Sequence, residues 1–301
     1  ARAPTSRAST AVGRGSASLP TTVLILGAGG MLGRALGGLL GRDPRLLVAA
    51  LPRAELDITA DAPVAEVFRT LAPKIVLNAA AYTDVDGCER DPERARRGNA
   101  EGPRVVAEAC RATGAFLVHL STDFVFDGTL DRPYRETDAP APVSAYGASK
   151  LEGERLVAAA CPGALIGRTA WTFGAGRDNF VTTALRRARA GGPLSVVTDQ
   201  TGSPTWTEDL AKAIMALVKA GATGTFHVVN AGTASRHELA VAALAAAGLG
   251  AVPVAPARTV PAPGIAARPA YSVLDTAAFT RRTGRAPRPW REALRDYVLT
   301  L

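Results

Sequence analysis

Residues 22–33 read TVLILGAGGMLG. The first five of them form an unbroken apolar run, which is typical of a strand buried on both faces of a parallel sheet. The glycines follow at once, and leucines then recur at helical spacing through Leu40. The stretch therefore predicts a strand, a tight turn and a helix, the opening unit of a Rossmann-type, doubly wound α/β sheet.

The glycine turn has the spacing that a dinucleotide requires. Gly27, Gly30 and Gly33 let the backbone turn tightly and approach a pyrophosphate. Free N–H groups and the dipole at the start of the following helix favour an anion there, beside Met31 and Leu32. Because the pattern lies between a strand and a helix, it predicts a dinucleotide site rather than a structural turn without a ligand.

The second predicted strand is residues 46–50. In dinucleotide-binding folds, residues at the end of this strand bind the adenosine ribose. Arg53 is the nearest charge beyond it, and two interpretations stay open: a contact to the 2′-phosphate of NADPH, or a surface arginine. Asp57 and Ile58 are expected to flank the adenine, as a carboxylate followed by an apolar side chain.

Two further buried-type strands are predicted at residues 74–77 and 116–120, separated by a helix over 92–113. The first runs into small residues at 78–83, which leave space for a flat ligand against the backbone. The second ends in Ser121-Thr122-Asp123. A hydroxyl at the carboxyl end of a parallel strand points into the crevice where ligands bind.

Tyr146-Gly147-Ala148-Ser149-Lys150 places a phenol and an ammonium one helical turn apart, on one face. A nearby ammonium stabilises phenolate and lowers the tyrosine pKa, so Tyr146 is a candidate proton donor. In isolation the pattern would fit an exposed tyrosine and lysine on a solvated helix. Together with Thr122 or Ser121 and a dinucleotide turn, it predicts a site that reduces a carbonyl with hydride from nicotinamide.

Composition excludes several other classes of protein. The 301 residues are 47% hydrophobic and 21% charged, with a net charge of +8. There is no apolar run long enough for a membrane helix, and residues 1–20 are expected to be a disordered tail rather than a secretory signal. The positive charge is spread along the chain, which favours a phosphate-bearing ligand over nucleic acid. Three cysteines without CxxC spacing predict neither a disulfide framework nor a metal site, and they suit the cytoplasm.

Beyond residue 170 the pattern loosens. Helices are predicted over 180–190, 208–219 and 290–301, and strands over 164–169, 194–197 and 224–229. Ser235 and Glu238 form a capping box at the start of another helix, and the proline-rich residues 251–269 are expected to be a loop that acts as a lid. We expect residues 21–170 to form an NAD(P)-binding domain, and 171–301 mainly a smaller C-terminal substrate-binding lobe.

The chain resembles the extended short-chain dehydrogenase/reductase superfamily and, within it, the dTDP-4-dehydrorhamnose reductase family. The resemblance covers roughly residues 22–301. The segments that carry it are GAGGMLG at 27–33, LDIT at 56–59, NAAAYTDVDGCE at 78–89, STDFVFDG at 121–128, PYRETDAPAPVSAYGASK at 133–150, RTAWTFG at 168–174, DQTGSPTW at 199–206 and RPAYSVLDT at 268–276.

The resemblance assigns a role to each matching position. It implies that Thr122, Tyr146 and Lys150 are the catalytic group, and that Lys150 also binds the nicotinamide ribose. The implied substrate and cofactor contacts are Asp123 beside Thr122, Trp171 against the hexose, Asn179, Gln200 and Arg268 to sugar or nucleotide, and Ala79, Ala80 and Tyr82 along the cofactor. Each has a simpler alternative: Trp171 as a core residue, Gln200 as a turn residue and Arg268 as a surface charge.

The implied reaction is reduction of the C4 ketone of a dTDP-4-dehydro-6-deoxy-L-hexose by NADPH or NADH, with dTDP-L-rhamnose as the expected product. The alternatives are a tailoring reductase for antibiotic sugars of the dihydrostreptose type, and a non-catalytic regulatory subunit that binds dinucleotide. A dehydratase is disfavoured because Phe124, not glutamate, follows Asp123. Some relatives form a dimer around magnesium through a glutamate whose position is Ala35 here. We therefore expect a monomer, or a homodimer without that metal.

Overall fold

The apolar runs of the first half form a parallel sheet. The computed structural model describes residues 20–301, so the predicted tail lies outside the described residues except for Pro20. Six strands are hydrogen-bonded in the order β10-β5-β4-β3-β1-β2, and every neighbouring pair is parallel. They are β1 (Thr21–Leu26), β2 (Leu46–Leu51), β3 (Ile75–Asn78), β4 (Phe116–Thr122), β5 (Leu165–Thr169) and β10 (Gly224–His227).

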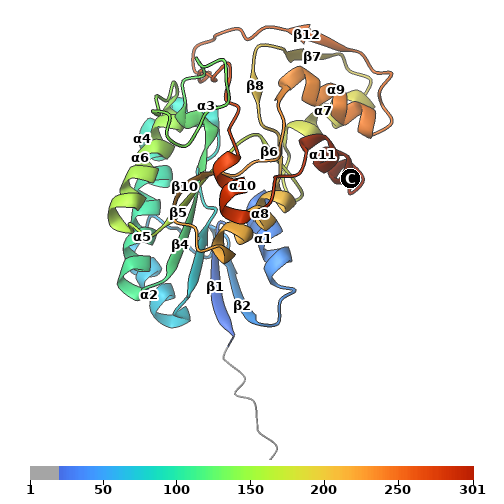
Figure 1. Cartoon of the computed structure of the whole chain (residues 1–301). Coiled ribbons are helices and arrows are strands. Elements are labelled where there is room, and N and C mark those ends of the chain that lie inside the picture. Colours follow the sequence, from blue (N-terminus) through green and yellow to red (C-terminus); the bar gives the residue numbers. More distant parts are fainter. Residues whose placement is uncertain (1–19) are drawn as a thin grey trace, which may run out of the picture.

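Helices cover both faces of this sheet, which confirms the predicted Rossmann-type class (Figure 1). Val23 and Ile25 of β1 pack toward one helical layer, and Leu24 and Leu26 toward the other, so the whole strand is apolar. The first layer consists of α1 (Met31–Leu40), α8 (Thr207–Lys219) and α10 (Ala277–Thr283). The second consists of α2 (Asp61–Leu71), α5 (Gly102–Thr113) and α6 (Ala145–Ala160).

The strand order reverses next to β1, which lies between β2 and β3. In open α/β sheets such a reversal opens a crevice above the carboxyl ends of the strands. Gly27 follows β1 and Ala79 follows β3, so the glycine turn and the small residues after β3 meet at this point.

A smaller lobe lies beside the carboxyl ends of the sheet (Figure 1). Its core joins α7 (Phe180–Arg189), α9 (Arg236–Ala246) and α11 (Trp290–Val298) through residues such as Leu185, Leu239 and Leu294. Its strands are short pairs: β6 (Thr172–Phe173) with β9 (Thr205–Trp206), β7 (Leu194–Val197) with β12 (Val254–Ala257), and β8 (Thr201–Gly202) with β11 (Ala234–Ser235).

Three details differ from the sequence expectation or refine it. Residues 254–257, expected in a loop, form β12 and pair in parallel with β7. The helix expected over 92–113 consists of α4 (Pro92–Arg96), a π-helical turn over Arg97–Glu101, and α5. After Trp206 the chain returns to the sheet, because α8 packs on α1 and β10 extends the sheet beside β5.

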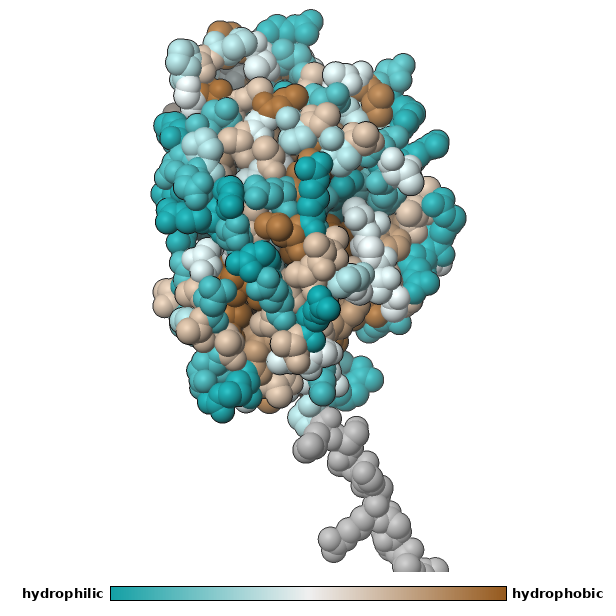
Figure 2. Space-filling view, turned by 90° about the vertical axis from the view of Figure 1, so that its left-hand side faces the viewer, coloured by the Kyte–Doolittle hydropathy of each residue, from teal (hydrophilic) through white to brown (hydrophobic). Residues whose placement is uncertain are grey.

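No helix among residues 20–301 is both long and apolar enough to cross a bilayer. In the face shown in Figure 2, hydrophobic residues lie scattered among hydrophilic ones. The large apolar side chains that are exposed are also scattered along the chain: Leu47, Val143, Val241, Val260, Ile265, Leu299 and Leu301.

Candidate active site

A cavity of about 1060 Å³ lies over the carboxyl ends of the strands and is lined from both halves of the chain. Most of the residues singled out from sequence line it. They are Gly27, Gly30, Met31, Leu32, Gly33, Arg53, Asp57, Ile58, Ala79, Ala80, Tyr82, Thr122, Asp123, Tyr146, Lys150 and Trp171. The fold therefore brings the predicted cofactor residues and the predicted catalytic group into one space.

The glycine turn fits a dinucleotide phosphate. Gly27 has φ +75°, and a Cβ there would lie 2.6 Å from the backbone N of Ala80. A Cβ on Gly33 would overlap the carbonyl oxygen of Gly27. At the start of α1 the N-cap is Gly30, which offers no side-chain cap, so the N–H groups of the first turn are available to an anion.

Arg53 and Asp57 lie together in the segment that follows β2. Arg53 Nη2 is 3.2 Å from Asp57 Oδ2, and Asp57 Oδ1 accepts hydrogen bonds from the N–H and the hydroxyl of Thr59. The backbone hydrogen bond from Thr59 lowers the pKa of Asp57, and the Arg53 charge acts in the same direction. Both side chains line the cavity, and the contact of Arg53 to a 2′-phosphate stays a prediction.

The catalytic candidates come from two neighbouring elements. Thr122 ends β4, and Tyr146 lies in the first turn of α6, which Ser144 caps by accepting the N–H of Gly147 at 3.2 Å. Lys150 lies one turn further, and its Nζ donates a 2.6 Å hydrogen bond to the carbonyl of Leu120 on β4. All three predicted catalytic side chains are buried.

The electrostatics of this group differ from the sequence expectation. Burial raises the pKa of Tyr146 above its usual value, although the Thr122 hydroxyl opposes the shift. Burial lowers the pKa of Lys150 to about 8, while the carboxylate of Glu154 acts in the opposite direction. Lys150 Nζ is held on the Leu120 carbonyl, and its predicted effect on the phenol of Tyr146 stays a prediction. A phenol carries its proton at neutral pH even at its ordinary pKa near 10, and burial shifts the pKa of Tyr146 further in that direction.

Asp123 is held between two hydroxyl groups, one of which the sequence did not reveal. Thr122 Oγ1 donates to Asp123 Oδ1 at 3.0 Å, and Ser272 Oγ donates to Asp123 Oδ2 at 2.6 Å. Burial raises the pKa of Asp123 to about 6, against the hydrogen bonds from Ser272 and Thr122 and the charge of Arg236. Ser272 is 149 residues away in sequence, and its only signal was its place in the segment RPAYSVLDT.

Trp171 and Arg236 form the wall contributed by the lobe. Trp171 has φ +45°, a rare backbone conformation for a bulky residue. One side of its indole packs so closely on Gly202 that a Cβ there would overlap the ring. The guanidinium carbon of Arg236 lies 3.6 Å from the ring centroid. Arg236 lines the cavity, and sequence reasoning missed it because only the capping box beside it carried a signal.

Three predicted substrate contacts do not line the cavity. Asn179 caps α7, and its Nδ2 donates to Tyr297 Oη at 2.9 Å. Gln200 Nε2 donates to Thr259 Oγ1 at 3.0 Å, and Arg268 Nη1 forms a 2.5 Å ion pair with Asp86. Each of these polar groups already has a partner within the protein, so their contacts with substrate stay predictions.

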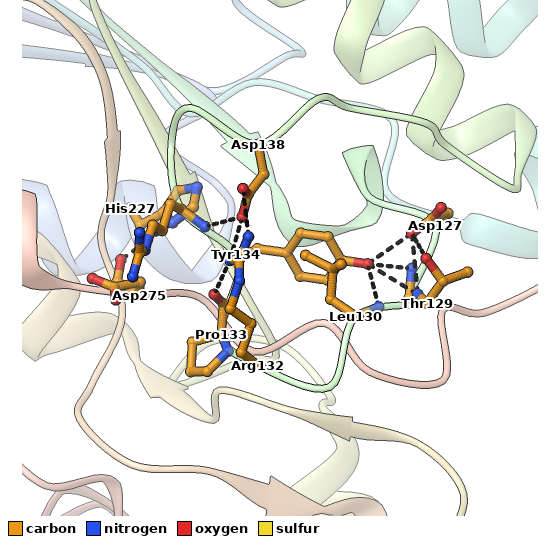
Figure 3. Close-up of polar contacts among 11 residues, drawn as sticks. Asp127, Thr129, Leu130, Arg132, Pro133, Tyr134, Asp138, His227 and Asp275 are labelled. Atoms are coloured by element: carbon orange, nitrogen blue, oxygen red, sulfur yellow. Dashed lines mark hydrogen bonds and ion pairs between the residues drawn. The ribbon is translucent and has the colours of Figure 1, made fainter.

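The loop that leads from Asp123 to the tyrosine helix is held by one aromatic residue. Tyr134 Oη donates to Asp127 Oδ1 at 2.7 Å and accepts the N–H groups of residues 128–130, as Figure 3 shows. Its ring stacks on Phe126 with centroids 4.2 Å apart. Its backbone bonds to Val273 and Asp275, next to Ser272. The loop and the segment around Ser272 therefore hold each other in place.

Known proteins resemble this chain over nearly its whole length. The family model described as RmlD substrate binding domain matches residues 21–301. A dTDP-4-dehydrorhamnose reductase of Mycolicibacterium smegmatis is 43% identical over 281 residues, covering 92% of this chain and 84% of that protein. A Streptomyces antibioticus protein named "Probable dTDP-4,6-dihydroxy-2-methyloxan-3-one 4-ketoreductase" is 45% identical, covering 91% and 93%.

Solved structures agree with this similarity. The crystal structure of dTDP-4-dehydrorhamnose reductase from Bacillus anthracis, in complex with NADP, superposes with a TM-score of 0.90 and 36% identity. The match covers 95% of this chain and all of that one.

Proposed function

The chain belongs to the RmlD substrate binding domain family, and we propose on that premise that its cavity is the active site of a reductase. The enzyme reduces the C4 ketone of a dTDP-4-dehydro-6-deoxy-L-hexose with NAD(P)H. The substrate that we assign is dTDP-4-dehydrorhamnose, and the product is dTDP-L-rhamnose. The observation that carries the proposal is that Thr122, Tyr146 and Lys150 line the same cavity as the glycine turn.

The proposed chemistry follows from the state of these side chains. Bound nicotinamide would supply hydride to C4 of the sugar. Tyr146, whose phenol carries its proton at neutral pH, donates that proton to the alkoxide that develops on O4. Thr122 turns its hydroxyl from Asp123 toward the same oxygen and helps to hold it. Lys150, fixed on the Leu120 carbonyl, binds the nicotinamide ribose.

We assign NADPH as the preferred cofactor. Arg53 supports this choice because it presents a cation beside Asp57 at the ribose end of the cavity. The free N–H groups at the start of α1 would hold the diphosphate, and Ala79, Ala80 and Tyr82 would line the nucleotide. NADPH as reductant and three free cysteines also suit a cytoplasmic enzyme.

A second candidate is a 4-ketoreductase that tailors sugars for antibiotics. The 45% identity to the Streptomyces antibioticus protein favours this close variant. A purely regulatory, dinucleotide-binding role is less well supported, because such a role has no need for the buried group of Thr122, Tyr146 and Lys150. For the assembly, we propose a monomer or a homodimer without a magnesium bridge, since Ala35 replaces the glutamate expected for the metal.

The test is a turnover assay with dTDP-4-dehydrorhamnose generated in situ and either NADPH or NADH, followed by NMR of the sugar product. We expect oxidation of the cofactor, faster with NADPH, and a rhamno-configured product. Another configuration at C4 would assign the enzyme to a tailored sugar. Cofactor binding without turnover on any dTDP-keto sugar would contradict the reductase assignment.

A further inference from the structure

Arg236 is a charged donor without a partner in the protein. It is half-buried at the start of α9 and lines the cavity. Within residues 20–301, its guanidinium donates no hydrogen bond and forms no ion pair; its contacts are the rings of Trp171, at 3.6 Å, and Phe180, at 5.3 Å. Because Arg236 lines the cavity, these N–H groups are available to a ligand there.

The surroundings of Arg236 hold it in place without neutralising it. The two aromatic rings fix the plane of the guanidinium, and the Ser235–Glu238 capping box fixes the start of its helix. The carboxylate of Asp123, which acts on the charge of Arg236, is already bonded at both oxygens by Thr122 and Ser272. Burial lowers the pKa of Arg236 to about 10, Asp123 opposes that shift, and the charge of Arg268 adds to it. The side chain is therefore still a cation at neutral pH, whereas the charge of Arg268 is paired with Asp86.

We propose that Arg236 binds the diphosphate of the nucleotide sugar, and that Trp171 is the platform that holds its guanidinium in position. This inference rests on the function proposed above and assigns a new residue to it. A planar guanidinium offers paired donors that match the oxygens of a phosphate. A sugar hydroxyl would use only one of the donors and would leave the charge uncompensated.

The same arrangement changes the role expected for Trp171. Gly202 packs against its ring and Arg236 lies over it. Because Arg236 occupies one face of the indole, we expect Trp171 to contribute to substrate binding mainly through that arginine.

The experiment measures binding of dTDP to the NADPH-loaded enzyme by isothermal titration calorimetry. Arg236→Gln is expected to weaken dTDP binding roughly 10- to 100-fold, because a charge-assisted hydrogen bond is lost. Arg236→Lys should lie in between, since it keeps the charge and loses the planar fork. The matched control is Arg291→Gln, because Arg291 also stacks on a tryptophan, 4.4 Å from the Trp290 ring, but lies outside the cavity. It should bind dTDP like the wild type.

The possible outcomes distinguish a wrong role for Arg236 from a wrong function for the enzyme. Equal dTDP affinity in the wild type and Arg236→Gln would overturn the inference. The same titration with dTDP-rhamnose tests the sugar: if Arg236→Gln loses affinity for dTDP-rhamnose but not for dTDP, Arg236 contacts the sugar and the inference is overturned. No dTDP binding by the wild type, with NADPH bound normally, would instead overturn the function on which the inference rests. The single variant Trp171→Ala should bind dTDP more weakly than the wild type. The double variant Trp171→Ala/Arg236→Gln should bind dTDP as weakly as Arg236→Gln alone. An added loss in the double variant would show that Trp171 contacts the nucleotide sugar directly.

Discussion

At the level of single residues, the position of Tyr146 in the cavity beside Thr122 gives it its proposed role as proton donor. The phenol is desolvated, its pKa is raised, and it enters the reaction carrying its proton. We predict that Tyr146→Phe keeps the affinity for NADPH and loses roughly 100-fold or more in kcat, the usual contribution of a positioned proton donor. Stopped-flow turnover and a fluorescence titration with NADPH would measure the two quantities. Tyr271→Phe, which changes a tyrosine outside the cavity, is the control, and unchanged kcat in Tyr146→Phe would remove the residue from the mechanism.

The raised pKa of Asp123 makes the free energy of unfolding fall as the pH rises. Its pKa is about 6 in the folded protein against 3.8 ordinarily, so the folded state holds the proton more tightly than the unfolded state does. Its contribution to the free energy of unfolding is therefore largest below pH 4 and is lost as the pH rises through about 6. Relative to Asp123→Asn, the wild type should lose about 2 kcal/mol between roughly pH 4.5 and pH 7.

Urea unfolding of the wild type and Asp123→Asn at several pH values would measure this difference. Subtracting the two curves cancels the groups that titrate alike in both proteins. Parallel curves across that range would show that the Asp123 carboxyl titrates normally. If the stability of the wild type relative to Asp123→Asn instead increases with pH, then the pKa of Asp123 is lowered in the folded protein.

At the level of elements, the glycine turn provides a matched pair of substitutions in α1. A Cβ on Gly33 would overlap the backbone of Gly27 and Ala28, whereas nothing lies within 4 Å of a Cβ on Gly38. We predict that Gly33→Ala costs about 2 kcal/mol of stability and weakens NADPH binding at least roughly 10-fold, because the turn must open. Gly38→Ala should instead stabilise the helix by about 0.5 kcal/mol or more and leave cofactor binding unchanged. Thermal unfolding and NADPH titration of both variants test this. If both variants have the same stability and the same affinity for NADPH, close packing at Gly33 is not what shapes the glycine turn.

The elements also show how far a sequence can be interpreted. Strands such as β1 and β4 were predicted closely, because an apolar run buried on both faces has few alternatives. The capping box at Ser235 was confirmed because its pattern is local. The strand β12 was missed because Pro256 interrupts it, and its place is an isolated two-stranded pair where proline is tolerated.

The side chains that complete the site were harder to predict. Ser272 and Arg236 reach Asp123 and Trp171 from distant parts of the chain, and no local spacing marks such contacts. The raised pKa of Tyr146 was also hidden, since a sequence shows which charges are near in the chain but not how completely a phenol is desolvated.

At the level of the whole molecule, residues 266–275 connect the two halves. Asp86 on α3 (Val85–Arg90) accepts from the backbone N of Ala266 and from Arg268, while Ser272 further along reaches Asp123. We predict that Asp86→Asn lowers the free energy of unfolding by about 1 kcal/mol, through the loss of a charge-assisted bond, and speeds proteolytic cleavage in the preceding proline-rich segment. Limited proteolysis and urea unfolding would measure both effects.

The exposed carboxylate of Asp131 supplies the control for that experiment, as Asp131→Asn. The control should be cleaved at the wild-type rate. If Asp86→Asn is cleaved no faster than the control, then the ion pair with Arg268 is not what holds the segment. If Arg268→Gln raises the KM for the nucleotide sugar while Asp86→Asn does not, then Arg268 contacts the substrate directly.

The late entry of β10 into the sheet has a consequence for synthesis of the protein. On the ribosome, β1 to β5 emerge first, and β5 then presents an open edge until residues 224–227 arrive to pair with it. An unpaired edge is a template for association with other chains. The nascent protein must therefore shield this edge, alone or with a chaperone, while the intervening lobe residues are translated. A fragment that stops near residue 170 would keep the open edge permanently and should aggregate.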